Sequence, residues 1–103
     1  MRINGTWRTR QVWVNGRELR PERSQQVWNH SPDGFNWGYA GSGPAQLALA
    51  ILLAAGCGDE LAVRLHQRFK FDAITPLPQA DFDVSIDVAS WVVAAVDDPP
   101  GPN

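Results

Sequence analysis

One stretch decides the fold: residues 29–55, which read NHSPDGFNWGYAGSGPAQLALAILLAA. From residue 45 to residue 55 only Gln46 is polar, so a helix here is apolar on nearly every side, a pattern typical of a central buried element. Pro44 suits the first helical position, because a backbone donor there would have no partner within the helix. Two glycines beyond the apolar run supply the stop. The sequence therefore predicts a buried central helix that begins at Pro44 and ends at residue 55.

The residues near the start of the chain favour strands. The segment 6–14 is rich in Trp, Thr and Val, and the dipeptide Asn15-Gly16 is typical of the type I′ turn that closes a hairpin. Residues 19–24 contain a proline and several charges and are expected to form a loop. Residues 25–29 are expected to add a third strand.

A second hairpin is predicted just before the central helix. Residues 31–34, Ser-Pro-Asp-Gly, have the order that a type I turn favours. Phe35, Trp37 and Tyr39 then alternate with smaller or polar residues, as in a half-buried strand. Together the two hairpins predict an antiparallel sheet of three to four strands.

Two further helices are expected after the central one. Residues 59–70 carry acids first and bases last, which suits the helix dipole, and place apolar side chains on one stripe. Residues 75–81 contain two prolines and form a connector. From Ile86 to Val96 apolar residues recur at helical spacing, with Asp83 or Ser85 as the cap.

The predicted fold class is α+β: a small antiparallel sheet of three to four strands packed against a central apolar helix, plus two further helices. A chain of 103 residues fits one such domain, over residues 1–98, with a disordered tail at residues 99–103.

Charge and cysteine content limit the classes of partner and compartment. The net charge is −2, but the first 28 residues are basic and the last 33 hold six aspartates and no base. This balance argues against bulk nucleic-acid affinity and leaves room for a basic patch. Cys57 is the single cysteine, so no internal disulfide forms, and the apolar run at residues 47–55 is too short to span a bilayer. We expect a cytoplasmic protein that does not associate with membranes.

The stretch before the central helix also carries a resemblance. Four glycines and four aromatic or imidazole rings lie between His30 and Gly43. Residues 34–52 resemble the signature GFxWGYxGSGPAQLALAxL of an uncharacterised family of short proteins from phages, plasmids, bacteria and haloarchaea. The family brings no established activity. The resemblance implies a mobile-element setting, in which short proteins commonly act as accessory or counter-defence factors.

The glycine-rich junction has two interpretations. Free amide groups near Ser42 and Gly43, at the positive end of a helix dipole, are typical of a phosphate or carboxylate site, with Tyr39 and His30 as side-chain contacts. The alternative is that the glycines only let the chain turn tightly while the aromatic rings cover the helix. The known nucleotide-binding motifs are absent, because Gln46 stands where a dinucleotide fingerprint needs a third small residue.

Catalytic and metal sites have little support in the sequence. His30, Ser31 and Asp33 include the residue types of a nucleophile and its base, but neighbours in a chain rarely point together, and the turn already explains them. A metal site would need His30, His66, Cys57 and scattered aspartates, none at chelating spacing. His66 is interpreted as a polar-face helix residue. We assign no catalytic residue, no metal and no cofactor.

Arginines interleave with tryptophans in the first 28 residues, a mixture suited to a protein interface or to stacking on single strands. A solvated sheet face is the alternative interpretation. The interface candidates are Arg8, Arg10, Trp13, Arg17, Trp28 and Trp37.

These observations lead to two functional hypotheses. We expect a small non-catalytic interaction protein, a mobile-element accessory or inhibitor protein that acts on a host protein or protein–nucleic-acid complex of nucleic-acid-targeting defence. A homodimer and direct nucleic-acid binding are further partner hypotheses. The alternative function is a phosphate- or nucleotide-binding module, enzymatic or not, that uses the glycine-rich junction.

Overall fold

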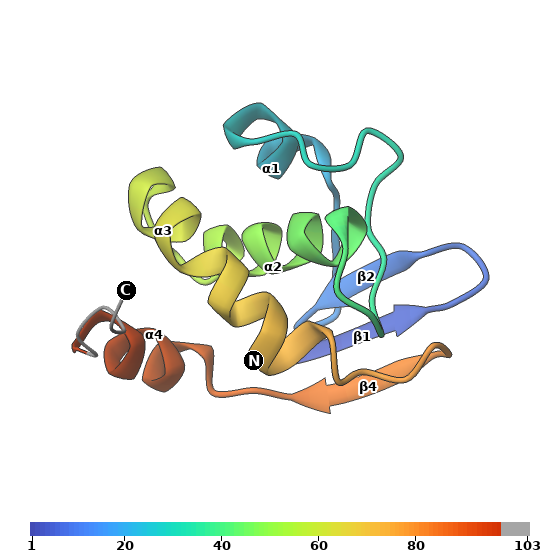
Figure 1. Ribbon diagram of the computed structural model, residues 1–103. Helices are drawn as coiled ribbons and strands as arrows, with labels where there is room; N and C mark the ends of the chain where they lie inside the picture. The colour runs from blue at the N-terminus through green and yellow to red at the C-terminus, as the bar shows by residue number, and fades with distance from the viewer. Residues whose placement is uncertain (98–103) are drawn as a thin grey trace.

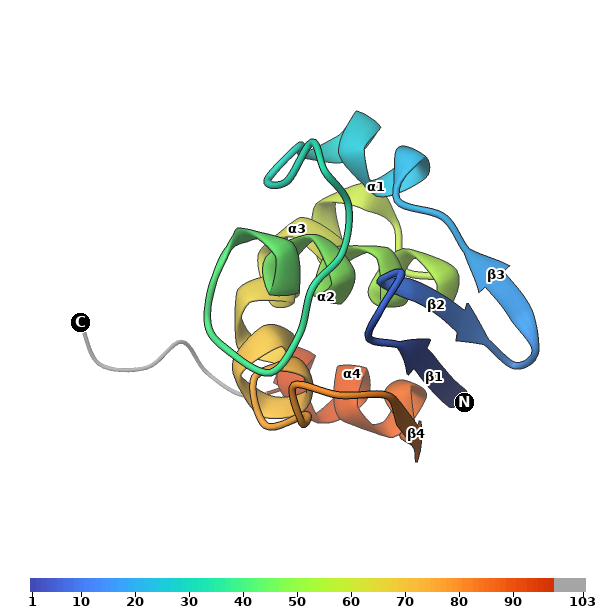
Figure 2. The ribbon, with the colours of Figure 1, turned by 90° about the vertical axis from the view of Figure 1, so that its right-hand side faces the viewer.

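The computed structural model describes residues 1–97, in which helices pack on one face of an antiparallel sheet (Figures 1 and 2). The elements are β1 (Arg2–Thr6), β2 (Gln11–Val14), β3 (Arg17–Leu19), α1 (Glu22–Val27), α2 (Ser42–Ala54), α3 (Asp59–Phe69), the π-helical turn η1 (Lys70–Ile74), β4 (Phe82–Ser85) and α4 (Val88–Asp97). The predicted α+β class is confirmed. Within residues 1–97 the sheet has four strands, and α1 joins the three predicted helices.

The strands lie in the order β3-β2-β1-β4, and every neighbouring pair is antiparallel. Ile3 of β1 pairs with Val14 on one side and with Val84 on the other. Because side chains alternate along a strand, these residues share one face with Gly5 and its partners. Ile3 is 1% exposed, so this face is the one that meets the helices. The opposite face carries polar residues and Trp13.

Helix α2 is the centre of the molecule. Ten of its thirteen residues, from Gly43 to Leu52, are buried. It contacts α1, α3, η1 and β3, and Figure 2 shows it with α1 and α3 on the same side of the strands. The helix begins at Ser42, two residues before the predicted start, and ends at Ala54 before Gly56, which has a φ of +97°. The prediction of a buried central helix is therefore confirmed.

Two predicted strands are wrong. Residues 25–29 belong to the end of α1 and the segment after it, because a helical turn starts after Pro21 and the Ser24 hydroxyl donates to the Pro21 carbonyl at 2.8 Å. The turn at residues 31–34 forms, with the Gly34 amide donating to Ser31 O, but residues 35–39 are not a strand. Gly38 lies at φ +83° and its amide donates to Ile74 O, which takes this segment away from the sheet.

Two strands were missed. Strand β1 contains Gly5 and few apolar residues, so its sequence signal is weak. Strand β4 holds Asp83 and Ser85, which were expected to cap a helix. The cap of α4 is instead Asp87, whose carboxylate accepts hydrogen bonds from the Ser90 amide at 3.0 Å and the Ser90 hydroxyl at 2.8 Å. Ile86 therefore lies before the helix.

The structure describes the predicted domain as far as residue 97. Asp97 is the last residue of α4, and the tail predicted at residues 99–103 lies outside the described residues. No helix within residues 1–97 is long and apolar enough to cross a membrane.

The close packing at Gly5 makes a first prediction. A Cβ atom at this position would overlap the Phe82 ring and approach the Trp37 ring to 2.9 Å. We expect Gly5→Ala to lower the free energy of unfolding by about 1–3 kcal/mol through overpacking. The control is Asn4→Ala on the opposite face of β1, which should change it by less than about 0.5 kcal/mol. Denaturant titration of both variants measures the difference, and equal stabilities would contradict the packing described here.

Candidate functional site

The single polar residue of the predicted central helix, Gln46, organises one end of the molecule. Its side chain is fully buried, and its Nε2 donates to Ser24 Oγ at 2.8 Å and to Trp28 O at 3.1 Å. Its Oε1 accepts from the backbone amides of His30 at 2.8 Å and Ser31 at 3.0 Å. The amide group thus uses both donors and both lone pairs of its oxygen. Gln46 therefore fixes α1 and the segment after it onto α2.

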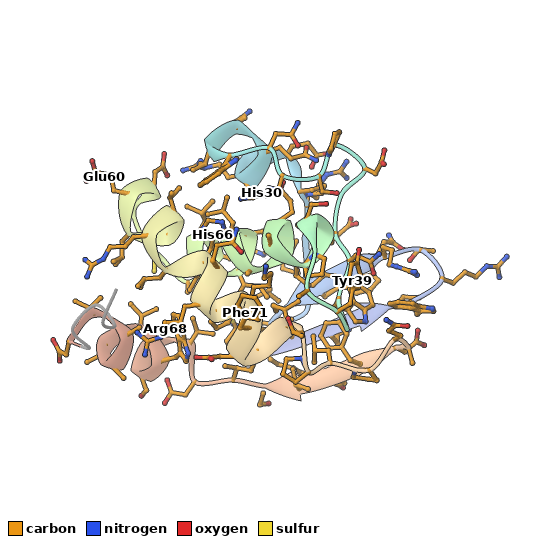
Figure 3. All side chains as sticks on the ribbon, viewed as in Figure 1. His30, Tyr39, Glu60, His66, Arg68 and Phe71 are labelled. Carbon is orange, nitrogen blue, oxygen red and sulfur yellow. The ribbon has the colours of Figure 1, made fainter. Side chains whose placement is uncertain are left out.

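This attachment brings two histidines together, as Figure 3 shows. His30 Nε2 lies 2.9 Å from His66 Nε2, and His66 Nδ1 lies 2.6 Å from Val63 O. A carbonyl only accepts, so the His66 Nδ1 carries a proton and its Nε2, in the neutral ring, accepts. His30 Nε2 must then be the donor of the pair, which leaves a lone pair on His30 Nδ1. This assignment of protons follows from the hydrogen-bond geometry.

Trp28 covers the histidine pair from outside. Its ring stacks on His30 with centroids 4.4 Å apart and an interplanar angle of 26°, and its edge meets His66 at 5.5 Å. The Trp28 side chain is nevertheless 48% exposed. It is therefore a large aromatic surface residue that is held in place by its neighbours.

Lys70 is the first residue of η1. It is 8% exposed, and its ammonium lies 4.4 Å from the centroid of the Phe71 ring. Phe71 is 57% exposed. In the described part of the chain no carboxylate forms an ion pair with Lys70. The stem of Lys70 is thus packed inside the protein, and its ammonium lies over the exposed Phe71 ring.

Burial and the nearby ammonium keep the histidines neutral. The pKa of His30 is lowered, mainly by burial and further by His66 and Lys70. Burial also lowers the pKa of His66, although its hydrogen bond to Val63 O opposes this shift, and Lys70 adds a smaller lowering. At neutral pH the pair is therefore two neutral rings joined by one hydrogen bond.

The sequence pointed to part of this site. His30 was a candidate, but its partner is His66 and not Ser31 or Asp33. The interpretation of His66 as a polar-face residue is wrong: it is 1% exposed, because the segment after α1 folds over it. The signal that could have found the site is Gln46, since one polar residue in an otherwise apolar helix needs buried partners.

The glycine-rich junction is tightly packed. A Cβ atom on Gly43 would lie 3.1 Å from the Asn36 backbone nitrogen, and Gly41 faces the ring of Tyr39. Tyr39 is 40% exposed, and Figure 3 places it away from His30. Ser42 is exposed and starts α2 without a side-chain cap. The structure thus groups His30 with Trp28 and His66, and leaves Tyr39 with the glycines.

The predicted interface residues are scattered. Arg8 and Arg17 are exposed, and Trp13 is partly buried on the outer sheet face. Arg10 lies over the Trp7 ring, 3.4 Å from its centroid, and donates to Asn36 Oδ1 at 3.1 Å.

Trp37 does not belong to any surface, contrary to its selection as an interface candidate. It is fully buried and donates its indole N–H to Ala80 O at 2.9 Å. Its ring meets Trp7 and Phe82 edge-on, so it is a core residue.

Comparison with known proteins supplies a family. Residues 3–94 match DUF6166, a family of unknown function. The chain belongs to this family. No curated protein matches the chain, and no solved structure matches it.

The DUF6166 chain offers few metal ligands at this site. In residues 1–97 no three side chains among His, Cys, Asp and Glu are grouped to hold an ion. His30 and His66 supply two nitrogens only, and the Lys70 ammonium beside them opposes a cation. Cys57 lines a separate hollow of about 170 Å³ with Arg23 and Ser24, and burial raises the pKa of its thiol.

Replacing Gln46 tests the organisation of the DUF6166 site. Gln46→Leu keeps the volume but removes all four hydrogen bonds of the side chain. The Ser31 amide loses its partner, whereas the His30 amide still donates to Trp28 O and the Ser24 hydroxyl to Pro21 O. We expect the free energy of unfolding to fall by about 1–3 kcal/mol, the cost of one polar group left unpaired. Gln67→Leu, an exposed change on α3, is the matched control and should be nearly neutral. Urea denaturation gives both values, and a neutral Gln46→Leu would refute the role of the network.

The lowered histidine pKa values predict a pH dependence of stability. Their ordinary value is about 6.5. Below about pH 6.5 the histidines of the unfolded chain become protonated, whereas the two folded histidines stay neutral to lower pH. The free energy of unfolding therefore falls as the pH is lowered through this range. Denaturation at about pH 7.5 and about pH 5.5 should show lower stability in acid, with a smaller difference in His66→Gln. An equal difference in wild type and variant would contradict the assignment to this pair.

Proposed function

We propose that this protein is a small non-catalytic interaction protein that uses Trp28 as the anchor for a protein partner. The observation that carries the proposal is that Trp28 is 48% exposed and yet fixed. Its ring stacks on His30, and its carbonyl accepts a hydrogen bond from buried Gln46. Tryptophan is the residue type most enriched at the energetic centre of protein interfaces.

Fixing the side chain before binding favours affinity. A flexible exposed side chain loses rotamer freedom when a partner immobilises it, which costs about 0.5–1.5 kcal/mol. Trp28 has already lost that freedom against His30 and His66. The partner then gains the contact area of the indole without that cost.

Exposed ion pairs lie at the start of α1, the helix that ends just before Trp28. Arg23 of α1 pairs with Asp59 of α3 at 2.7 Å, and Arg20 pairs with Glu22 at 3.3 Å. All four side chains are more than half exposed. The elements beside Trp28 thus carry charged side chains in contact with water, and a polar periphery is usual for a transient protein interface.

The kind of partner is proposed from the family setting. The resemblance to short proteins of phages and plasmids supports a mobile-element accessory or inhibitor protein. We propose that its partner is a host protein within a nucleic-acid-targeting defence complex, met in the cytoplasm. Nucleotide binding at the glycine-rich junction has less support, because Asn36 and the Tyr39 ring lie against its glycines.

Removing the anchor tests the proposal. A captured host partner should bind Trp28→Ala at least about 10-fold more weakly, because truncating a central tryptophan typically costs about 2 kcal/mol or more. The matched control is Arg17→Ala, an exposed interface candidate on β3, for which we expect less than about a twofold change. Affinities are measured by biolayer interferometry with the immobilised chain, after capture and identification of the partner by mass spectrometry.

Two outcomes would overturn the proposal. The first is a partner that loses affinity with Arg17→Ala or Trp13→Ala and not with Trp28→Ala, which would move the interface to the outer sheet face. The second is a dimeric mass for the wild-type protein by light scattering and a monomeric mass for Trp28→Ala. That result would show that Trp28 is covered by a second copy instead of a host protein.

A further inference from the structure

Strand β3 forms one edge of the sheet, with β2 on one side and no strand of residues 1–97 on the other (Figure 2). Asn15 donates its backbone amide toward β1, to Arg2 O at 2.8 Å, so the backbone groups of Val14 before it point toward β3. Val14 faces Arg17, and hydrogen-bonded and non-hydrogen-bonded pairs alternate along antiparallel strands. The N–H and C=O of Glu18 therefore point away from β2, toward the free edge.

Two adjoining hollows lie between β3 and the end of α2. Leu19 of β3 and Ala54 of α2 line both of them. The hollow beside Cys57 and Leu53 measures about 170 Å³, and the one beside Val14 measures about 380 Å³. Both exceed the roughly 15 Å³ that a single water needs, so a side chain can enter. The sheet thus ends at a free strand with space next to its helix-facing side.

The same side of β3 also carries a charge. Arg17 and Leu19 are two residues apart in a strand, so they share one face, which is the face of buried Val12. Within residues 1–97 Arg17 forms no ion pair. Glu18 lies on the opposite face, where it accepts a hydrogen bond from Gln11 Nε2 at 3.3 Å. A strand added at this edge would meet an arginine and an apolar hollow on one face and a carboxylate on the other.

We infer that the free edge of β3 binds an extended segment of a partner protein, which joins the sheet as a fifth strand. The segment runs antiparallel to β3, as all neighbouring strands of this sheet do. Its central residue exchanges both backbone hydrogen bonds with Glu18 and is basic, to suit the carboxylate. The residue before it is large and apolar and enters the hollow beside Leu19, and the residue after it is acidic and faces Arg17. Trp28 lines neither hollow, so this surface is separate from the proposed interface.

Strand β3 does not accept every segment. It has three residues, of which two are charged, and short, charged edge strands resist unspecific pairing. An added strand makes one complete pair of backbone hydrogen bonds, with Glu18, so its side chains must supply the remaining affinity. The hollow beside Leu19 and the Arg17 guanidinium are the two contacts that do so.

The test uses a synthetic peptide, acetyl-Thr-Thr-Leu-Lys-Glu-Thr-amide, whose Leu, Lys and Glu are set opposite Leu19, Glu18 and Arg17. Titration into the ¹⁵N-labelled full-length chain should shift the Glu18 amide signal saturably. Methylating the backbone nitrogen of the peptide Lys removes the donor that faces β3 and should weaken binding at least about 10-fold. Methylating that of Leu, whose N–H points away, should change the affinity less than about threefold. Equal affinities for the two methylated peptides, or no saturable shift at about 5 mM peptide, would overturn the inference.

Two variants of the chain test the edge and the hollow separately. Glu18→Pro removes the outward N–H and keeps the pairing with β2, because an edge strand tolerates proline where its N–H faces solvent. It should bind the peptide at least about 10-fold more weakly, whereas Glu18→Ala keeps the N–H and should stay within about threefold of wild type. Ala54→Phe fills the hollows from an exposed position and should also weaken binding at least about 10-fold. Unaltered binding in folded Glu18→Pro or in Ala54→Phe refutes the site.

Charge reversal checks the register. Arg17→Glu should bind the peptide about two- to fivefold more weakly and should prefer a peptide with Lys in place of Glu, since opposite charges across strands stabilise pairing and like charges oppose it. Arg8→Glu, an exposed change of the same charge between β1 and β2, should leave both affinities unchanged. If Arg17→Glu keeps the preference of the wild type, the proposed register is wrong.

A second copy of this chain is the other candidate occupant of the edge. A dimeric mass by light scattering that becomes monomeric in Glu18→Pro would show that the chain covers its own edge, and would overturn the inference of a partner segment. A monomeric mass for both, together with saturable peptide binding by the wild type, supports it.

Discussion

The structure depends on one buried side chain, Gln46. Helix α2 is otherwise apolar and could pack against any apolar surface, because hydrophobic contact has no direction. The four hydrogen bonds of Gln46 do have direction, and they select one arrangement of α1 and of residues 28–31. The amide could not be buried without these partners, so the packing of α2 and the path of the preceding segment are determined together.

The same constraint creates the polar cluster on the surface above α2. Once residues 28–31 are fixed, His30 is held against His66 and Trp28 is held against both rings. The charge of Lys70, the first residue of η1, further lowers the pKa of both histidines. Neutral imidazoles tolerate this burial, whereas the lysine gains no opposite charge from residues 1–97.

Sequence patterns predicted those helices and turns that are determined by residues close together in the chain. The apolar run of α2, the amphipathic stripe of α3 and the Asn15-Gly16 turn all formed as expected. The wrong predictions concern segments whose structure depends on contacts with residues far away in the sequence. Strand β1 is held by β2 and β4 on its two sides, although Gly5 weakens its own strand preference. His66 lies at a polar position of its helix and is buried only because residues 36 positions earlier cover it. Strand β4 was missed because Asp83, which lies between Phe82 and Val84, also fits a helix cap.

The distinctive glycine-rich stretch serves packing, which explains why the candidate site lies outside it. Gly43 lets the start of α2 approach the Asn36 backbone, and this close approach leaves Trp37 in the core with its indole on Ala80 O. Phe35 and Trp37 of this segment are turned inward, and the exposed Tyr39 ring packs against Gly41. The exposed ring that is fixed by its neighbours is Trp28, which lies before the glycines in the sequence. The basic start and the acidic end of the chain meet in ion pairs such as Arg2–Asp83, and the neutral histidine pair adjoins the exposed, fixed Trp28 ring.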